Sequence, residues 1–163
     1  MRYWSVASGL LTDERGLLLV ANKRRGGSID WSTPGGVIDE GETSVGALTR
    51  EVAEETGLHV DEWGTLAWTV EVDFVELEMH LDVEVHAAKS FEGSIALEDP
   101  DGIVTAAEFM SGSTALRRLK GSPLWVSEPL GSWIVAPWDD TCHFAYSAHG
   151  TNPATMRAER RVT

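Results

Sequence analysis

The stretch GVIDEGETSVGALTREVAEETGL, Gly36 to Leu58, constrains the fold of this chain more than any other part of the sequence. Thr43 has the side chain of a helix N-cap, and Gly57 suits the position just after a helix ends. Between them, apolar residues recur at intervals of three and four, which predicts a helix of about thirteen residues. The apolar positions of this stripe are Val45, Leu48 and Val52.

The same segment carries three glutamates, Glu51, Glu54 and Glu55, at positions i, i+3 and i+4. This spacing places them on one helix face, which we expect to point away from the apolar stripe. Like charges at these spacings repel by a few tenths of a kcal/mol per pair, so a cation is the expected partner. Mg²⁺ suits such a site because it prefers oxygen ligands and bridges to phosphates. Taken alone, however, such a pattern is more often a solvated helix surface.

The residues before the helix support the interpretation of the three glutamates as a metal site. Pro34, Gly35 and Gly36 allow the backbone to approach a ligand closely, and phosphate is one candidate. Glu42 belongs to the sequence EGE and is expected near the same face of the helix. The glutamates are thus preceded, at fixed spacing, by a glycine-rich turn and a further carboxylate.

Together these residues follow the pattern G-x5-E-x7-R-E-U-x-E-E-x-G-U, where U is aliphatic. On this motif the chain resembles the Nudix (MutT-like) hydrolase family. Every specified position is matched, by Gly36, Glu42, Arg50, Glu51, Val52, Glu54, Glu55, Gly57 and Leu58.

The resemblance implies an α/β fold, a Nudix-type α/β/α sandwich with a central mixed β-sheet, and strands flanking one helix agree with it. We expect residues 1–138 to form the Nudix domain. Residues 139–163 are expected to be a C-terminal extension that packs on the domain or on a second subunit, since its arginines contrast with the acidic body.

The resemblance also implies metal-dependent hydrolysis of a pyrophosphate bond, with Mg²⁺ as the cofactor and Mn²⁺ as a possible substitute. Glu51 is expected to be a metal ligand or the base for the attacking water, and Arg50 to orient it. The expected catalytic residues are Arg50, Glu51, Glu54 and Glu55; the metal ligands are Gly36, Glu51, Glu54 and Glu55; an additional acid comes from Glu98, Asp99 or Asp101; and the phosphate-binding residues are Lys23, Arg24 and Arg25. A solvated basic loop is an equally good reading of the last three.

The motif does not determine which substrate the protein binds. Features typical of family members that hydrolyse ADP-ribose or dinucleoside polyphosphates are missing after it, which favours a MutT-like hydrolase of (d)NTPs or oxidised NTPs. ADP-ribose or nucleotide-sugar hydrolysis is one alternative, and a non-catalytic nucleotide-sensing domain is another. Two groups of side chains are candidates for the nucleoside pocket. The polar residues His80, Asp82 and Glu84 either line it or face solvent. The tryptophans Trp31, Trp68, Trp125 and Trp133 either stack on a base or fill the core.

Composition limits the partners. The chain has 26 acidic and 13 basic residues and a net charge of −13, which argues against binding nucleic acid polymers but not small nucleotides. No apolar run has the length of a membrane helix, and Cys142 is the only cysteine. We therefore expect a cytoplasmic protein with a small-molecule nucleotide substrate, no membrane partner and a possible homodimer.

The remaining elements follow from β-rich runs and turn residues. The expected strands are 3–11 and 17–23, paired as a hairpin, a short strand at 31–38, long strands at 58–72 and 75–89, and a last strand at 103–111. Helices are expected from Ser113 to Lys120 and around 127–135, and the tail after Pro153 has a helix-forming composition.

Overall fold

A six-stranded mixed sheet forms the centre of the computed structural model, which describes residues 1–162. Its strand order is β10-β9-β6-β7-β1-β5, with β1 parallel to β7 and β6 parallel to β9. Its strands are β1 (Arg2–Leu10), β5 (Gly35–Val37), β6 (His59–Phe74), β7 (Met79–Glu92), β9 (Cys142–His149) and β10 (Arg157–Arg160). A second, smaller sheet contains β2 (Thr12–Asp13), β3 (Gly16–Lys23), β4 (Ile29–Ser32) and β8 (Val104–Met110).

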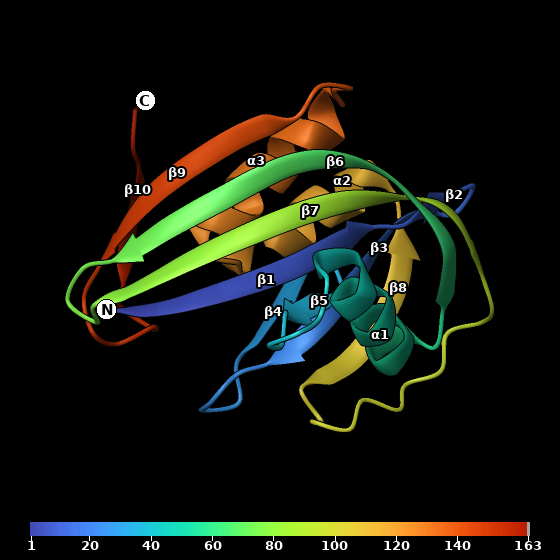
Figure 1. The fold of residues 1–163 in the computed structure, drawn as a ribbon, viewed down its shortest axis with the longest axis horizontal. Coiled ribbons are helices and arrows are strands. Elements are labelled where there is room, and N and C mark those ends of the chain that lie inside the picture. The colour runs from blue at the N-terminus through green and yellow to red at the C-terminus, as the bar shows by residue number, and fades with distance from the viewer. Residues whose placement is uncertain (163) are drawn as a thin grey trace.

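Helices cover both faces of the large sheet, which confirms the predicted α/β/α class. The helices are α1 (Ser44–Thr56), α2 (Gly112–Arg118), the short 3₁₀ helix η1 (Leu119–Gly121) and α3 (Leu124–Val135). Helix α1 lies on one face, and α2 and α3 lie on the other (Figure 1). Because side chains alternate along a strand, Ala7 of β1 packs toward α1, whereas its neighbours Val6 and Ser8 face the cavity beside α3.

Helix α1 has the ends that the sequence predicts. The hydroxyl of Thr43 accepts a hydrogen bond from the Gly46 N–H at 3.0 Å, and Gly57 has a left-handed φ of 81°. Leu48 and Val52 are fully buried. The prediction that Val45 belongs to the buried stripe is wrong, because this residue lies in the first turn of the helix and is 37% exposed.

The predicted hairpin of strands 3–11 and 17–23 is wrong. β1 pairs with β5 and β7 in the large sheet, whereas β3 pairs with β2, β4 and β8 in the small one. The chain passes between the sheets at Leu11, which is fully buried. The turn itself is present between β2 and β3, where the Asp13 carboxylate accepts a bond from the Arg15 N–H at 2.8 Å.

Residues 75–78 form a turn rather than the start of a strand. β6 continues to Phe74, and the chain reverses through Glu78, which has a φ of 49°. The sequence VELE has no glycine, proline or asparagine, so its alternating pattern resembles a strand.

The C-terminal segment forms strands instead of the predicted helix, so 103–111 is not the last strand. β9 buries Phe144, Tyr146 and Ala148 against the core, and β10 is the edge strand beside it. Beyond β10, Arg161 forms ion pairs with carboxylates of β6. Two predicted helices also shift slightly, since Ser111 rather than Ser113 caps α2, and Pro129 lies inside α3. In residues 1–162 no helix has the length and hydropathy needed to cross a membrane.

Truncation tests whether residues 139–163 are separable from the domain. Deleting them removes Phe144 and Tyr146 from the core and exposes the edge of β6. We expect the shortened protein to lose cooperative unfolding or to drop in Tm by at least about 10 °C. A matched control that ends at Arg161 should unfold like the full chain. An unchanged Tm for the long deletion, measured by circular dichroism, would show that the segment is a dispensable extension.

Candidate functional site

The glutamates of α1 lie against the glycine turn of β5. The Glu55 carboxylate is buried and accepts a hydrogen bond from the Gly35 N–H at 2.9 Å. Gly36 adjoins Glu51 so closely that an added Cβ would lie 2.5 Å from the Glu51 Cδ. A side chain at position 36 would therefore displace the Glu51 carboxylate, and glycine leaves room for it.

Arg50 connects the remaining carboxylates of the motif. Its Nε and Nη2 donate to the two oxygens of Glu42 at 3.0 and 2.9 Å. Its Nη1 donates to Oε1 of Glu51 at 3.0 Å and lies 3.4 Å from Oε2 of Glu54. The guanidinium therefore offsets the repulsion that the spacing of the glutamates creates.

Burial and pairing give these carboxyl groups different pKa values. Burial raises the pKa of Glu55 from an ordinary 4.5 to about 8, and burial also raises the pKa of Glu51. The hydrogen bond from Arg50 instead lowers the pKa of Glu42. At neutral pH and without a cation, Glu55 thus favours the neutral form.

The site fits a divalent cation by the chemistry of its donors. In the hydrogen bonds among residues 1–162, Arg50 contacts one oxygen of Glu51 and one of Glu54, and Gly35 contacts one oxygen of Glu55. Each carboxylate therefore retains a second oxygen, and oxygen is the ligand that Mg²⁺ and Mn²⁺ prefer.

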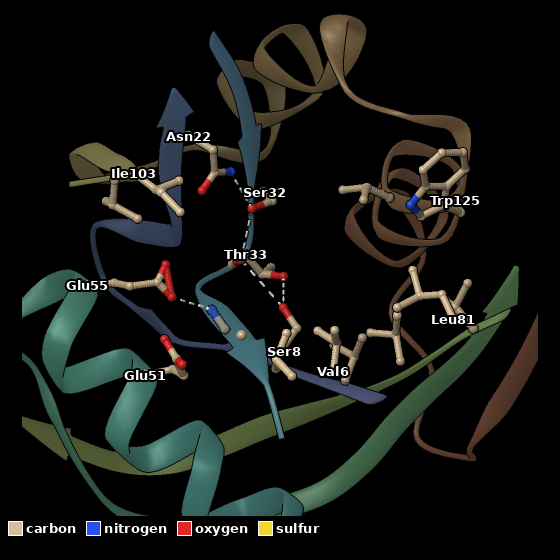
Figure 2. A pocket seen from close by; sticks show the side chains of 18 of the residues that line it. Val6, Ser8, Asn22, Ser32, Thr33, Glu51, Glu55, Leu81, Ile103 and Trp125 are labelled. Atoms are coloured by element: carbon tan, nitrogen blue, oxygen red, sulfur yellow. Dashed lines mark hydrogen bonds between the residues drawn. The ribbon is translucent and has the colours of Figure 1, made fainter. Parts of the chain in front are cut away.

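A cavity of about 650 Å³ opens beside these acids, between the large sheet and α3 (Figure 2). Glu51 and Glu55 lie at one side of it, and Leu81 and Trp125 lie at the other. Next to the acids are polar side chains that the sequence analysis missed, because they resemble ordinary strand and turn residues. These are Ser8, Asn22, Ser32 and Thr33.

Only some of the other predicted site residues reach this cavity. From the later acidic loop, Asp99 and Asp101 line it and Glu98 does not. The Asp99 carboxylate accepts bonds from the N–H groups of Ile103 and Val104, both at 2.9 Å, so it organises its own loop. Asp101 contributes to the raised pKa of Glu51.

The three basic residues at the end of β3 and directly after it are similarly divided between the cavity and the solvent. Arg24 lines the cavity, but its guanidinium donates to Asp30 at 2.7 and 2.9 Å. Lys23 and Arg25 are exposed and lie outside the cavity lining.

The polar residues of β7, considered either for the nucleoside pocket or for a solvent-facing strand surface, lie on the face of the sheet away from the cavity. Leu81, Val83 and Val85 line the cavity, so the alternating His80, Asp82 and Glu84 belong to the opposite face. Of the four tryptophans considered, Trp68 and Trp125 line the cavity, and Trp31 and Trp133 do not.

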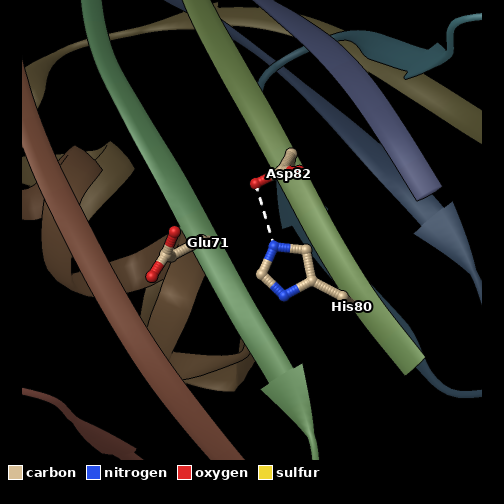
Figure 3. A group of neighbouring side chains, drawn as sticks. All are labelled: Glu71, His80 and Asp82. Atoms are coloured by element: carbon tan, nitrogen blue, oxygen red, sulfur yellow. Dashed lines mark hydrogen bonds and ion pairs between the residues drawn. The ribbon is translucent and has the colours of Figure 1, made fainter. Parts of the chain in front are cut away.

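The opposite face carries its own cluster, formed by Glu71, His80 and Asp82 (Figure 3). His80 Nε2 lies 3.1 Å from Asp82, and Arg161 donates to Glu71 at 2.7 Å. The bond between Asp73 and His80 raises the pKa of the histidine. His80 and Arg161 thus already partner these acids, and the ion pairs of Arg161 join the C-terminal segment to β6.

The structure is thus an α/β protein in which an acid-rich helix lies against two glycines beside a cavity and presents the oxygen ligands that hard cations prefer. The family model described as NUDIX domain matches residues 2–123, and the chain belongs to this family. Members of the family generally use divalent metal ions.

Relatives and solved structures are consistent with this membership. Oxidized purine nucleoside triphosphate hydrolase of Danio rerio is 33% identical over 91 residues, which cover 55% of this chain and 58% of that protein. RNA pyrophosphohydrolase of Sphingopyxis alaskensis is 35% identical over 79 residues, covering 48% and 50%. The chain thus spans only about half the length of these relatives. The MutT protein of Bacillus halodurans shares the fold, with a TM-score of 0.65 and 19% identity over 96% of this chain and 97% of that one.

The raised pKa of Glu55 predicts how stability depends on pH in the metal-free protein. Between pH 4.5 and about 8 the folded state holds a proton that the unfolded state has released. The free energy of unfolding should therefore fall as pH rises, by up to about 1.4 kcal/mol per pH unit for this group. Urea unfolding in EDTA should show this slope, and Glu55→Gln should lessen it. Parallel pH profiles for the two proteins would contradict the assignment.

The glycine turn predicts two contrasting substitutions. Gly36→Ala meets the end of the flexible Glu51 side chain, so it should displace that carboxylate and weaken Mn²⁺ binding by about tenfold or more with little loss of stability. Gly35→Ala is the matched control, because its Cβ would lie 2.1 Å from the backbone oxygen of Ala7 and should destabilise the fold. Calorimetric titration and thermal unfolding separate the two effects. Equal loss of stability in both variants would refute this account.

Proposed function

We propose that the chain is a Mg²⁺-dependent pyrophosphohydrolase of small nucleotides, with MutT-like hydrolysis of a (d)NTP or oxidised NTP as its leading activity. The observation that carries the proposal is that Glu51 and Glu55 line the cavity beside Gly35 and Gly36, while Arg50 holds Glu54 next to Glu51. Membership of the Nudix family supports it, as do the printed activities of the relatives. A cytoplasmic setting belongs to the same proposal.

Mg²⁺, with Mn²⁺ as a substitute, would be held by Glu51, Glu54, Glu55 and the backbone of Gly36, and it supplies neutralisation of phosphate charge. Arg50 keeps Glu51 and Glu54 in place through its Nη1, and the Gly35 N–H fixes the orientation of Glu55. These contacts hold the acids before substrate arrives, which reduces the reorganisation required during the reaction.

The proton of the attacking water requires an acceptor. Glu51 suits this role because it is half-buried, borders the cavity and is oriented by Arg50. Asp101 is the better additional acid of the later loop, since Asp99 is bonded to the backbone of its own loop. Arg24 is the phosphate contact we favour among the three basic residues, because it alone of them lines the cavity.

A substrate panel tests this function. Phosphate and pyrophosphate release should be Mg²⁺-dependent on (d)NTPs, oxidised NTPs, ADP-ribose and nucleotide sugars, with the fastest turnover on a triphosphate. Glu54→Gln should lower the rate at least about a hundredfold without loss of fold. Glu62→Gln, an exposed residue of β6 paired with Lys89, is the matched control and should retain full activity. Tight nucleotide binding without turnover on any substrate would instead support a sensing domain.

A further inference from the structure

The cavity has two chemically different halves. The half beside α1 holds the acids and the polar side chains of β1, β3 and β4 (Figure 2). The other half, here called the apolar chamber, is lined by residues of β6, β7 and α3. Its main walls are Val70, Leu81, Val83, Val85, Trp125 and Leu130.

The chamber contains little that could recognise the polar edge of a nucleobase. The side chains that β6, β7 and α3 contribute include no carboxylate, amide, hydroxyl or charged group, and their polar atoms are the indole nitrogens of Trp68 and Trp125. These nitrogens donate and do not accept. A base that carries N–H or amino groups would therefore leave donors unpaired, which disfavours its burial.

The polar side chains near the acids bond to one another, although the Asn22 amide does so through its NH₂ group and keeps its carbonyl oxygen as an acceptor in the hydrogen bonds among residues 1–162. The Ser8 hydroxyl bonds to Thr33 and donates to the Pro34 carbonyl at 3.2 Å. The Asn22 amide donates to Ser32 at 2.8 Å. They border the half of the cavity that adjoins the acids, so they do not change the apolar character of the chamber (Figure 2).

The roof of the chamber is a feature of this chain beyond the matched family region. Helix α3 begins at Leu124, whereas the family match ends at residue 123. Trp125, Val126 and Leu130 of this helix face the sheet across the chamber. Apolar surfaces that face each other across a cavity gain free energy when a hydrocarbon displaces water from between them.

We infer that the site also hydrolyses diphosphate monoesters of hydrophobic alcohols, with the hydrocarbon in the apolar chamber and the diphosphate at the acids of α1. This second activity rests on the proposed pyrophosphate chemistry and extends it to another substrate class. Water oxygen bonds to the terminal phosphorus, and the bond from that phosphorus to the bridging oxygen breaks. The bridging oxygen leaves in the alkyl monophosphate, inorganic phosphate is formed, and a proton of the water passes through a carboxylate to solvent.

The test compares n-alkyl diphosphates of increasing length and geranyl diphosphate with the best nucleotide of the panel. kcat/KM should rise about three- to fourfold for each added methylene until the chamber is filled. Turnover of nucleotides without turnover of any alkyl diphosphate overturns this inference alone. No turnover of either class overturns the proposed function as well.

A nearly isosteric variant tests where the hydrocarbon binds. Val83→Thr adds a hydroxyl to the chamber and should lower the ratio of kcat/KM for geranyl diphosphate to that for the nucleotide by about tenfold. Asp82→Asn, on the opposite face of the same strand, should leave the ratio unchanged. An unchanged ratio in a folded Val83→Thr protein overturns the assignment of the chamber. The length series in the natural chain gives a readout that does not depend on folding of the variant.

Discussion

The burial of one carboxylate, Glu55, is the constraint on which the site depends. Its helix is anchored by Leu48 and Val52, which pack between the two sheets, and this anchoring carries Glu55 into the interior beside Gly35. One backbone hydrogen bond does not offset the desolvation of a charge, which is why the pKa of Glu55 rises to about 8. A cation that binds the ionised form would relieve this penalty and release the proton, so binding of a cation at Glu55 should strengthen as pH rises.

Arg50 offsets a second unfavourable interaction, the repulsion among the carboxylates of the site. Four carboxylates lie within ion-pair distance of its guanidinium. Without this positive charge the carboxylates would repel one another and move apart. Lysine would not substitute well, because its single ammonium cannot reach Glu42 with two parallel bonds and Glu51 with another nitrogen. The planar fork satisfies one oxygen each of Glu51 and Glu54 and leaves the others for a ligand. The same residue therefore stabilises the helix and keeps the site available.

The sequence predicts the local elements of this site well and its long-range contacts poorly. Thr43, Gly57 and the glutamate spacing describe α1 correctly because capping and helical periodicity act within a few residues. The pairing of β1 with β7 was not predictable in this way, since it joins segments about 77 residues apart and depends on which face each strand buries. The turn at 75–78 was missed because VELE carries no glycine, proline or asparagine. The strands of the C-terminal segment were missed although Gly150 and Pro153 mark the connection between them, because the composition after Pro153 favours a helix.

The motif and the chamber are built from different parts of the chain, and this separation explains how much function the motif can predict. The acids come from α1 and its turn, whereas the chamber comes from β6, β7 and a helix beyond the matched region. Substitutions at Val83 or Trp125 would alter which group fits beyond the diphosphate of the proposed substrates without touching Glu51 or its partners. Since the reacting atoms lie only at the acids, the reaction can stay constant while the attached group varies. The chemical nature of the attached group therefore depends on the cavity-facing side of β7, which is opposite His80 and Asp82. Strand alternation places the apolar side chains of β7 on that side.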